Sequence, residues 1–198
     1  MREQGRVRWK RFALVFIPAA AVASVLVGAV AQGAIGASFV VAGEKIKVSA
    51  DLTRAWDVAE FPGVVETKGG KQIPVYVTTN RHSEVFNLCQ SYVVETPVGT
   101  VTFKATGGTG KDPVTADNQV IYARMLAGDT HYTNIQIGRD ASTASTVPEI
   151  TGQPGVVSQV SSMVVVKNSR QIILATSAER LGVPASLLRV LPGVQECF

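Results

Sequence analysis

Two stretches near the C-terminal end decide the fold class: VVSQVSSMVVV at residues 156–166 and QIILAT at residues 171–176. Both are rich in Val, Ile and Thr at a period near two, the pattern of half-buried β-strands. The same pattern recurs along the chain, at residues 45–52, 72–78, 92–95, 100–104, 119–125 and 132–137. Short strands at fairly even spacing predict a mainly β domain, built as a sandwich, a roll or a flattened barrel.

Turn-forming residues separate these stretches. Gly128-Asp129 and Asn168-Ser169 are expected to be turns between strands. The stretch at residues 139–154, RDASTASTVPEITGQP, is expected to be a long exposed loop because it is rich in Ser, Thr, Pro and Gly. The segment at residues 184–190, PASLLRV, is the one candidate for a helix outside the N-terminal region, although it also fits a strand.

The N-terminal region predicts a signal anchor. Residues 12–31 carry no charge, and a helix of this length spans about 30 Å, the thickness of a bilayer core. The positive-inside rule places the preceding basic residues in the cytoplasm and the rest of the chain outside. The basic topology residues are Arg6, Arg8, Lys10 and Arg11, and the apolar anchor residues include Phe12, Val15, Ile17, Leu26 and Val30.

The predicted organisation is therefore a cytoplasmic basic tail at residues 1–11, a transmembrane anchor at 12–34 and one extracytoplasmic all-β domain at 35–198. The alternative is a secretory signal peptide, cleaved after Ala31 in a small-x-small site. Cleavage would release the β domain as a secreted protein. The apolar run is longer than the usual signal-peptide core, which favours the anchor.

The charge distribution argues against nucleic acid as a partner. The net charge is +4, and residues 1–11 hold five basic side chains and one acidic one. The remaining chain is neutral, so the β domain lacks the basic face that binding to phosphates requires. The excess charge can instead contact anionic headgroups, which makes membrane lipid the expected partner.

The chain holds two cysteines, Cys89 and Cys197. In an oxidising compartment they are expected to form a disulfide, and the alternative is two free or intermolecularly paired thiols. No metal site is expected, because no further Cys or His lies at ligand spacing near either one.

No catalytic or cofactor motif is complete. The run Gly107 to Lys111 lacks the earlier glycine and the following Ser or Thr of a P-loop. The chain has no G-x-S-x-G pentapeptide, and its two histidines are His82 and His131. His82 lies in the polar segment 78–83, which is expected to be a solvated loop. We therefore expect no catalytic residues, no cofactor and no enzyme activity.

Several stretches together resemble a known family. They are VSAD at 48–51, GKQIPV at 70–75, NLCQS at 87–91, PVGT at 97–100, TNIQIGRDAS at 133–142, ATSA at 175–178 and PGVQECF at 192–198. Over residues 6–198 the chain resembles an actinobacterial family of membrane-anchored proteins of unknown function, some of which carry an automatic cholesterol esterase label. The family's cysteines match Cys89 and Cys197, which supports the disulfide. The resemblance implies an actinobacterial cell envelope and supplies no catalytic residue.

Three functions follow from these expectations. The first is a non-enzymatic structural or assembly component of the envelope, which associates with itself or with another envelope protein. The alternative is a lipid-binding module, in which the apolar runs 164–166 and 172–174 line a groove; the simpler interpretation is that these runs are core strands. The second alternative is a lipid esterase, which the absence of a nucleophile motif disfavours.

Overall fold

The computed structural model describes residues 44–147 and 150–198, which belong to one compact unit, Phe39–Phe198. The predicted anchor and the basic tail lie outside the described residues. Within the described part, no helix is both long and apolar enough to cross a membrane.

The described residues form an all-β domain, which confirms the predicted fold class. Its strands are β1 (Ile46–Glu66), β2 (Gln72–Phe86), β3 (Leu88–Thr96), β4 (Gly99–Gly107), β5 (Val114–Thr133), β6 (Gln136–Asp140), β7 (Val157–Ser177), β8 (Arg180–Gly182) and β9 (Leu187–Pro192), with one 3-10 turn, η1 (Ala141–Thr143). All pairings between these strands are antiparallel.

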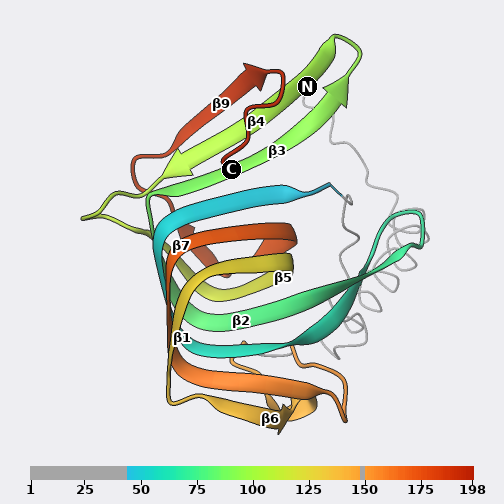
Figure 1. Cartoon of the computed structure of the whole chain (residues 1–198), viewed down its shortest axis with the longest axis vertical. Coiled ribbons are helices and arrows are strands. Elements are labelled where there is room, and N and C mark those ends of the chain that lie inside the picture. Colours follow the sequence, from blue (N-terminus) through green and yellow to red (C-terminus); the bar gives the residue numbers. More distant parts are fainter. Residues whose placement is uncertain (1–43, 148–149) are drawn as a thin grey trace, which may run out of the picture. The chain divides into compact units, whose positions relative to one another are not determined.

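The sheet closes on itself through four long strands. β1 pairs with β2, β2 with β5 and β5 with β7, and β7 pairs again with β1. The closing ladder runs from Ile46 opposite Ile173 to Glu60 opposite Gln159. The four strands therefore surround an interior, and β3, β4 and β9 extend the sheet beyond β1 (Figure 1). Of the expected architectures, the two facing halves resemble a sandwich whose edges are joined.

Residues with a left-handed backbone bend the long strands. Asp57 in β1, Asn118 in β5 and Asn168 in β7 have φ angles of 49°, 46° and 54°. Asp and Asn adopt this region more readily than other residues with a side chain, because their short polar groups bond locally. Each bend lets a strand turn around the interior without ending (Figure 1).

The expected turns at Gly128-Asp129 and Asn168-Ser169 are therefore wrong. Both pairs lie inside strands, β5 and β7, which continue through them. Gly128 has a φ of 149°, and a Cβ there would lie 2.5 Å from Val166 Cγ1. Glycine marks a bend and a close approach of two strands here, where the sequence indicated a chain reversal.

The segment 184–190 contains no helix. Its second half belongs to β9, which pairs with β4 from Leu187 opposite Thr106 to Pro192 opposite Val101. The strand alternative is therefore the correct one. Backbone pairing with a neighbouring strand decides the outcome for such a short apolar run.

A hydrophobic core lies on the outer face of the closed sheet. Its buried residues are Phe61, Val65, Val75, Val77, Val120, Ala141, Val147 and Leu174. Two of these, Ala141 and Val147, come from the stretch that was expected to be an exposed loop, and that expectation is wrong. Ala141 accepts a hydrogen bond from the N–H of Gly152 at 3.0 Å and donates its own N–H to Val156 at 2.8 Å. The stretch covers the core, and its small residues allow the close packing.

The C-terminal segment is fixed to the extension of the sheet. Cys89 in β3 and Cys197 form a disulfide, with Cα atoms 5.9 Å apart and a sequence separation of 108. A loop of this length implies about 4–5 kcal/mol of chain entropy removed from the unfolded state. Lys47 Nζ adds an ion pair of 2.7 Å with Glu196 and a hydrogen bond of 2.9 Å to the carbonyl oxygen of Phe198.

The packing of residues 141–156 predicts the effect of one methyl group. A Cβ at Gly152 would lie 2.4 Å from Ala141 Cβ and 2.9 Å from Phe61 Cδ2. Gly152→Ala should therefore lower the free energy of unfolding by about 1–3 kcal/mol, as overpacking does elsewhere. Chemical denaturation measures this difference. Gly69→Ala, where a Cβ would meet no atom within 4 Å, is the control and should change stability by less than about 0.5 kcal/mol. Equal stability of the two variants would contradict the packing of this segment.

Candidate ligand cavity

A cavity of about 640 Å³, partly open to solvent, lies inside the closed sheet. Most of the lining side chains are apolar and come from all four long strands. Representative ones are Val48 and Val58 in β1, Val85 in β2, Ile121 in β5, and Val164 and Ile173 in β7. Leu88 and Leu188, from β3 and β9, line the end toward the sheet extension. The volume lies in the range of small-molecule sites in proteins.

The left-handed residues determine which side chains face the cavity. In a regular strand every second residue points to the same face. Lining residues are instead three positions apart across each bend: Ala55 and Val58 around Asp57, Ala116 and Gln119 around Asn118, and Val166 and Ser169 around Asn168. A prediction that applies a strict period of two along these strands therefore assigns side chains to the wrong face of the sheet on one side of each bend.

The two apolar runs considered for a groove divide between two faces. Val164, Val166 and Ile173 line the cavity, whereas Leu174 belongs to the outer core. Alternation along β7 makes both interpretations partly correct, because successive residues point to opposite faces of the sheet.

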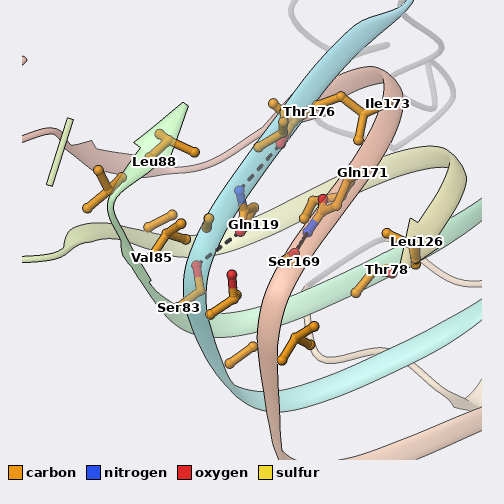
Figure 2. Close-up of a pocket in the computed structure, with 18 of the residues that line it drawn as sticks. Thr78, Ser83, Val85, Leu88, Gln119, Leu126, Ser169, Gln171, Ile173 and Thr176 are labelled. Atoms are coloured by element: carbon orange, nitrogen blue, oxygen red, sulfur yellow. Dashed lines mark hydrogen bonds between the residues drawn. The ribbon is translucent and has the colours of Figure 1, made fainter. Parts of the chain in front are cut away.

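A polar belt crosses the middle of the cavity. Gln119 Oε1 accepts hydrogen bonds from Asn80 Nδ2 at 3.3 Å and from Ser83 Oγ at 3.0 Å, and Gln119 Nε2 donates to Thr176 Oγ1 at 3.5 Å. On β7, Gln171 Nε2 donates to Ser169 Oγ at 3.2 Å. Figure 2 shows Gln119 between Ser83 and Thr176, with Leu88 and Val85 on one side of the belt and Thr78 and Leu126 on the other.

One acceptor of this belt has no partner. Asn80 is 2% exposed, and its Oδ1 makes no hydrogen bond within the part of the chain that the structure describes. A buried polar atom without a partner is unfavourable and is uncommon in native proteins. Asn80 belongs to the residues that line the cavity.

A carboxyl group lies at the far end of the cavity. Glu60 is 7% exposed, and its Oε2 accepts hydrogen bonds from Gln159 Nε2 and, at 3.4 Å, from Tyr132 Oη. Burial raises the pKa of the Glu60 carboxyl, and side-chain hydrogen bonds from Gln159, Tyr132 and Thr78 offset part of this effect.

Two tyrosines beside Glu60 respond to the same environment. Burial, followed by the charge of Glu60, raises the pKa of Tyr76 to about 12. The same two causes raise the pKa of Tyr132. Both phenols therefore stay protonated at neutral pH, and Tyr132 Oη donates its hydrogen bond to Glu60 at this end of the cavity.

The histidines lie outside the cavity lining. His82 is in β2, so the expectation of a solvated loop at residues 78–83 is wrong. Its Nδ1 lies 2.7 Å from Asp117 Oδ1, and its ring centroid lies 5.5 Å from that of Trp56. His131 is exposed on β5. Across residues 44–147 and 150–198, no hydrogen bond joins either histidine to a serine hydroxyl.

Sequence reasoning missed the polar residues that matter here, namely Glu60, Asn80 and Gln119. The segment 78–83 does carry a signal, since polar residues in a strand of a closed sheet must face either solvent or the interior. That signal can be recognised only when it is known that the strand belongs to a sheet that closes on itself. The disulfide residues Cys89 and Cys197 are found as expected, and the anchor and topology residues lie outside the described part of the chain.

The buried position of Glu60 predicts a pH dependence. Its pKa in the folded protein is raised above the ordinary value of 4.5 that it has in the unfolded chain. Between these two values the folded state holds a proton that the unfolded state has lost, so stability falls as the pH rises through this window. Glu60→Gln removes this effect. As the pH rises above 4.5, the free energy of unfolding of the variant should increase relative to that of the wild type by up to about 1.4 kcal/mol per pH unit.

Urea denaturation from pH 4 to pH 8 measures the difference. Glu66→Gln on the exposed end of β1 is the control for the loss of one negative charge. If the stabilities of Glu60→Gln and wild type run parallel over the whole range, the buried ionisation is contradicted.

Comparison with known proteins now places the chain. Curated proteins and solved structures give no match to it. The DUF6230 family, described as a family of unknown function, matches residues 42–198, which is well over half of the chain and includes the whole closed sheet. The match agrees with the expected membership of a family of unknown function, and the chain belongs to the DUF6230 family.

Proposed function

We propose that this domain binds the apolar part of a lipid-like small molecule inside its closed sheet, and that it does so without catalysis. The observation that carries the proposal is the cavity of about 640 Å³ with a mostly apolar lining. A pocket with mostly apolar walls favours an apolar occupant, because the occupant removes the apolar surface of the walls from water.

The arrangement of polar groups supports binding over hydrolysis. The His82–Asp117 pair, the part of the domain closest to a catalytic arrangement, is absent from the cavity lining. A hydrolase acting on a bound lipid would need its base next to the ligand. We therefore prefer a binding module to the lipid esterase. Covalent labelling of a serine by a fluorophosphonate would favour the esterase instead.

The location is part of the same proposal. The uncharged stretch at residues 12–31 and the basic residues before it support a domain anchored at the outer face of the cell membrane. A membrane next to the cavity would supply lipid as the partner.

Native mass spectrometry of the full chain, extracted from membranes in mild detergent without reductant, tests both parts. We expect a chain that begins at Met1, is two protons lighter than the reduced form and carries lipid adducts. A chain that begins at Gln32 would contradict the anchor. Adduct-free protein under conditions that preserve a lipid-binding reference protein would contradict the lipid-binding function.

A pair of matched variants shows whether the adduct occupies the cavity. Ile121 lines the cavity, whereas Ile137 in β6 is 72% exposed. Ile121→Trp fills interior space and should reduce lipid occupancy about tenfold, a change of about 1.4 kcal/mol in binding. Ile137→Trp adds the same bulk outside and should leave occupancy unchanged. Equal occupancy in both variants would place the lipid elsewhere.

We infer self-association as a second candidate, because β9 ends the strand order of the sheet. An edge strand offers unpaired backbone groups to another chain. Leu187, Leu188 and Val190 in β9 are exposed apolar side chains, so this edge has little of the charge that normally protects an edge strand. A homo-oligomer formed through β9 would fit a structural or assembly role in the envelope.

A charge on this edge should prevent the association. Val190, 62% exposed and absent from the cavity lining, is the position of choice. Val190→Lys should shift the protein from oligomer to monomer in light scattering coupled to size-exclusion chromatography. Val98→Lys in the turn between β3 and β4 is the control, since Val98 is the same residue type and is 94% exposed outside any strand. A wild-type monomer, or a Val190→Lys oligomer, would contradict association through β9.

A further inference from the structure

We infer that the ligand of the cavity is an amphiphile with an anionic head group, whose oxygens bind Arg124 where the cavity opens to solvent, while the apolar tail lies inside. The inference rests on the proposed lipid-binding function and adds the charge and the position of the head group. It starts from Arg124, which is the one basic side chain among the lining residues of the described chain and is also exposed.

The wall of the cavity is split where the pairing of β2 with β5 ends. The last pair of this ladder is Tyr76 opposite Ala123. Beyond it, β2 continues along β1, whereas β5 turns away along β7 as far as Thr133 (Figure 1). Among the described strands, β5 therefore has a neighbour on one side only from Arg124 onward. Arg124 is the first residue of β5 beside the split.

Exposed lining residues show that the cavity opens at this part of β5. Leu126 and Tyr132 line the cavity and are 40% and 39% exposed. A side chain that borders both the interior and solvent lies at the rim of an opening, and Arg124 shares both properties. The rim, defined by these three residues, carries a cation next to apolar side chains. An amphiphile matches this pattern with a charged end beside an apolar chain.

Arg124 has no partner within the described chain. No ion pair or hydrogen bond joins its guanidinium to another described residue. The one acidic lining residue, Glu60, instead accepts hydrogen bonds from Tyr132 and Gln159. The N–H donors of an arginine match two oxygens of a carboxylate or a phosphate, and hydrogen bonds between ionised groups are the stronger ones. Arg124 is therefore free to bind an anion.

Other positions suit a charged head group less well. Deeper in the cavity, Asn80 Oδ1 and Thr78 Oγ1 each have less than 1 Å² of accessible surface, so a head group does not reach them. A carboxylate placed there would also lose its hydration without a cation to replace it. Toward the sheet extension, the exposed lining residue Leu188 is apolar. An ammonium at the rim would meet the like charge of Arg124.

Probes that share one tail test the head group on the full chain in an alkyl maltoside. They are hexadecanoate, hexadecyl phosphate, 1-hexadecanol and hexadecylamine, and native mass spectrometry measures the fraction of protein that carries each one. In Arg124→Gln the occupancy of each anion that binds the wild type should fall about fivefold, the upper range for an exposed ion pair, and that of the alcohol should stay unchanged. The anion with the larger occupancy identifies the head group as carboxylate or phosphate.

A matched variant and a salt series are the controls. Arg180→Gln removes an exposed arginine outside the lining and should leave every occupancy unchanged. Raising ammonium acetate from about 0.05 M to about 0.5 M should lower the occupancy of the anions in the wild type and leave that of the alcohol unchanged, because salt screens exposed charges.

The outcomes separate the two proposals. The anionic head group would be overturned if anion occupancy stayed unchanged in Arg124→Gln, fell equally in Arg180→Gln, or fell together with that of the alcohol, and the binding function would still stand. Absence of every adduct would overturn the binding function itself. If Arg124→Gln does not fold, the difference in salt dependence between anion and alcohol in the wild type decides the inference.

Discussion

Backbone pairing between β1 and β7 is the constraint on which the rest of this structure depends. These strands are far apart in sequence, and their ladder joins the first long strand to the last. Without it, the four strands would form an open sheet with one face exposed to water. With it, one face becomes an interior and the other carries the hydrophobic core, so one set of backbone hydrogen bonds creates both layers.

Closure of so few strands requires that each one bends sharply. In three of the four strands, β1, β5 and β7, the chain achieves this with Asp57, Asn118 and Asn168, whose left-handed backbone turns the strand and continues the ladder. Each of these residues also shifts the alternation of side chains by one position. The bends therefore determine the curvature of the sheet and the composition of the cavity wall at the same time.

The interior is wider than a side-chain core can fill, and the apolar packing of the domain lies mostly outside it. Phe61 and Leu174 pack with Ala141 and Val147 on the outer face, and small or polar residues such as Ala116 and Ser83 face inward. Small inward residues leave space, and buried amides give that space specific hydrogen-bonding positions. The disulfide between Cys89 and Cys197 fixes the C-terminal segment to β3 in the sheet extension.

The sequence by itself determined the β class, the pairing of the two cysteines and the strand in most apolar stretches, because these depend on local propensity and on a count of two thiols. It did not determine where strands end. Asn168-Ser169 and Gly128-Asp129 have the composition of turns, and only the ladder of β5 with β7 shows that the chain continues through them. The residues of the candidate site could not be predicted from the sequence for the same reason. Glu60, Asn80 and Gln119 lie on β1, β2 and β5, which are neighbours in the sheet, and the pairing of β1 with β7 makes their shared face an interior. Local patterns record which residues form strands, whereas the direction in which a polar side chain points depends on hydrogen bonds made to residues distant in sequence.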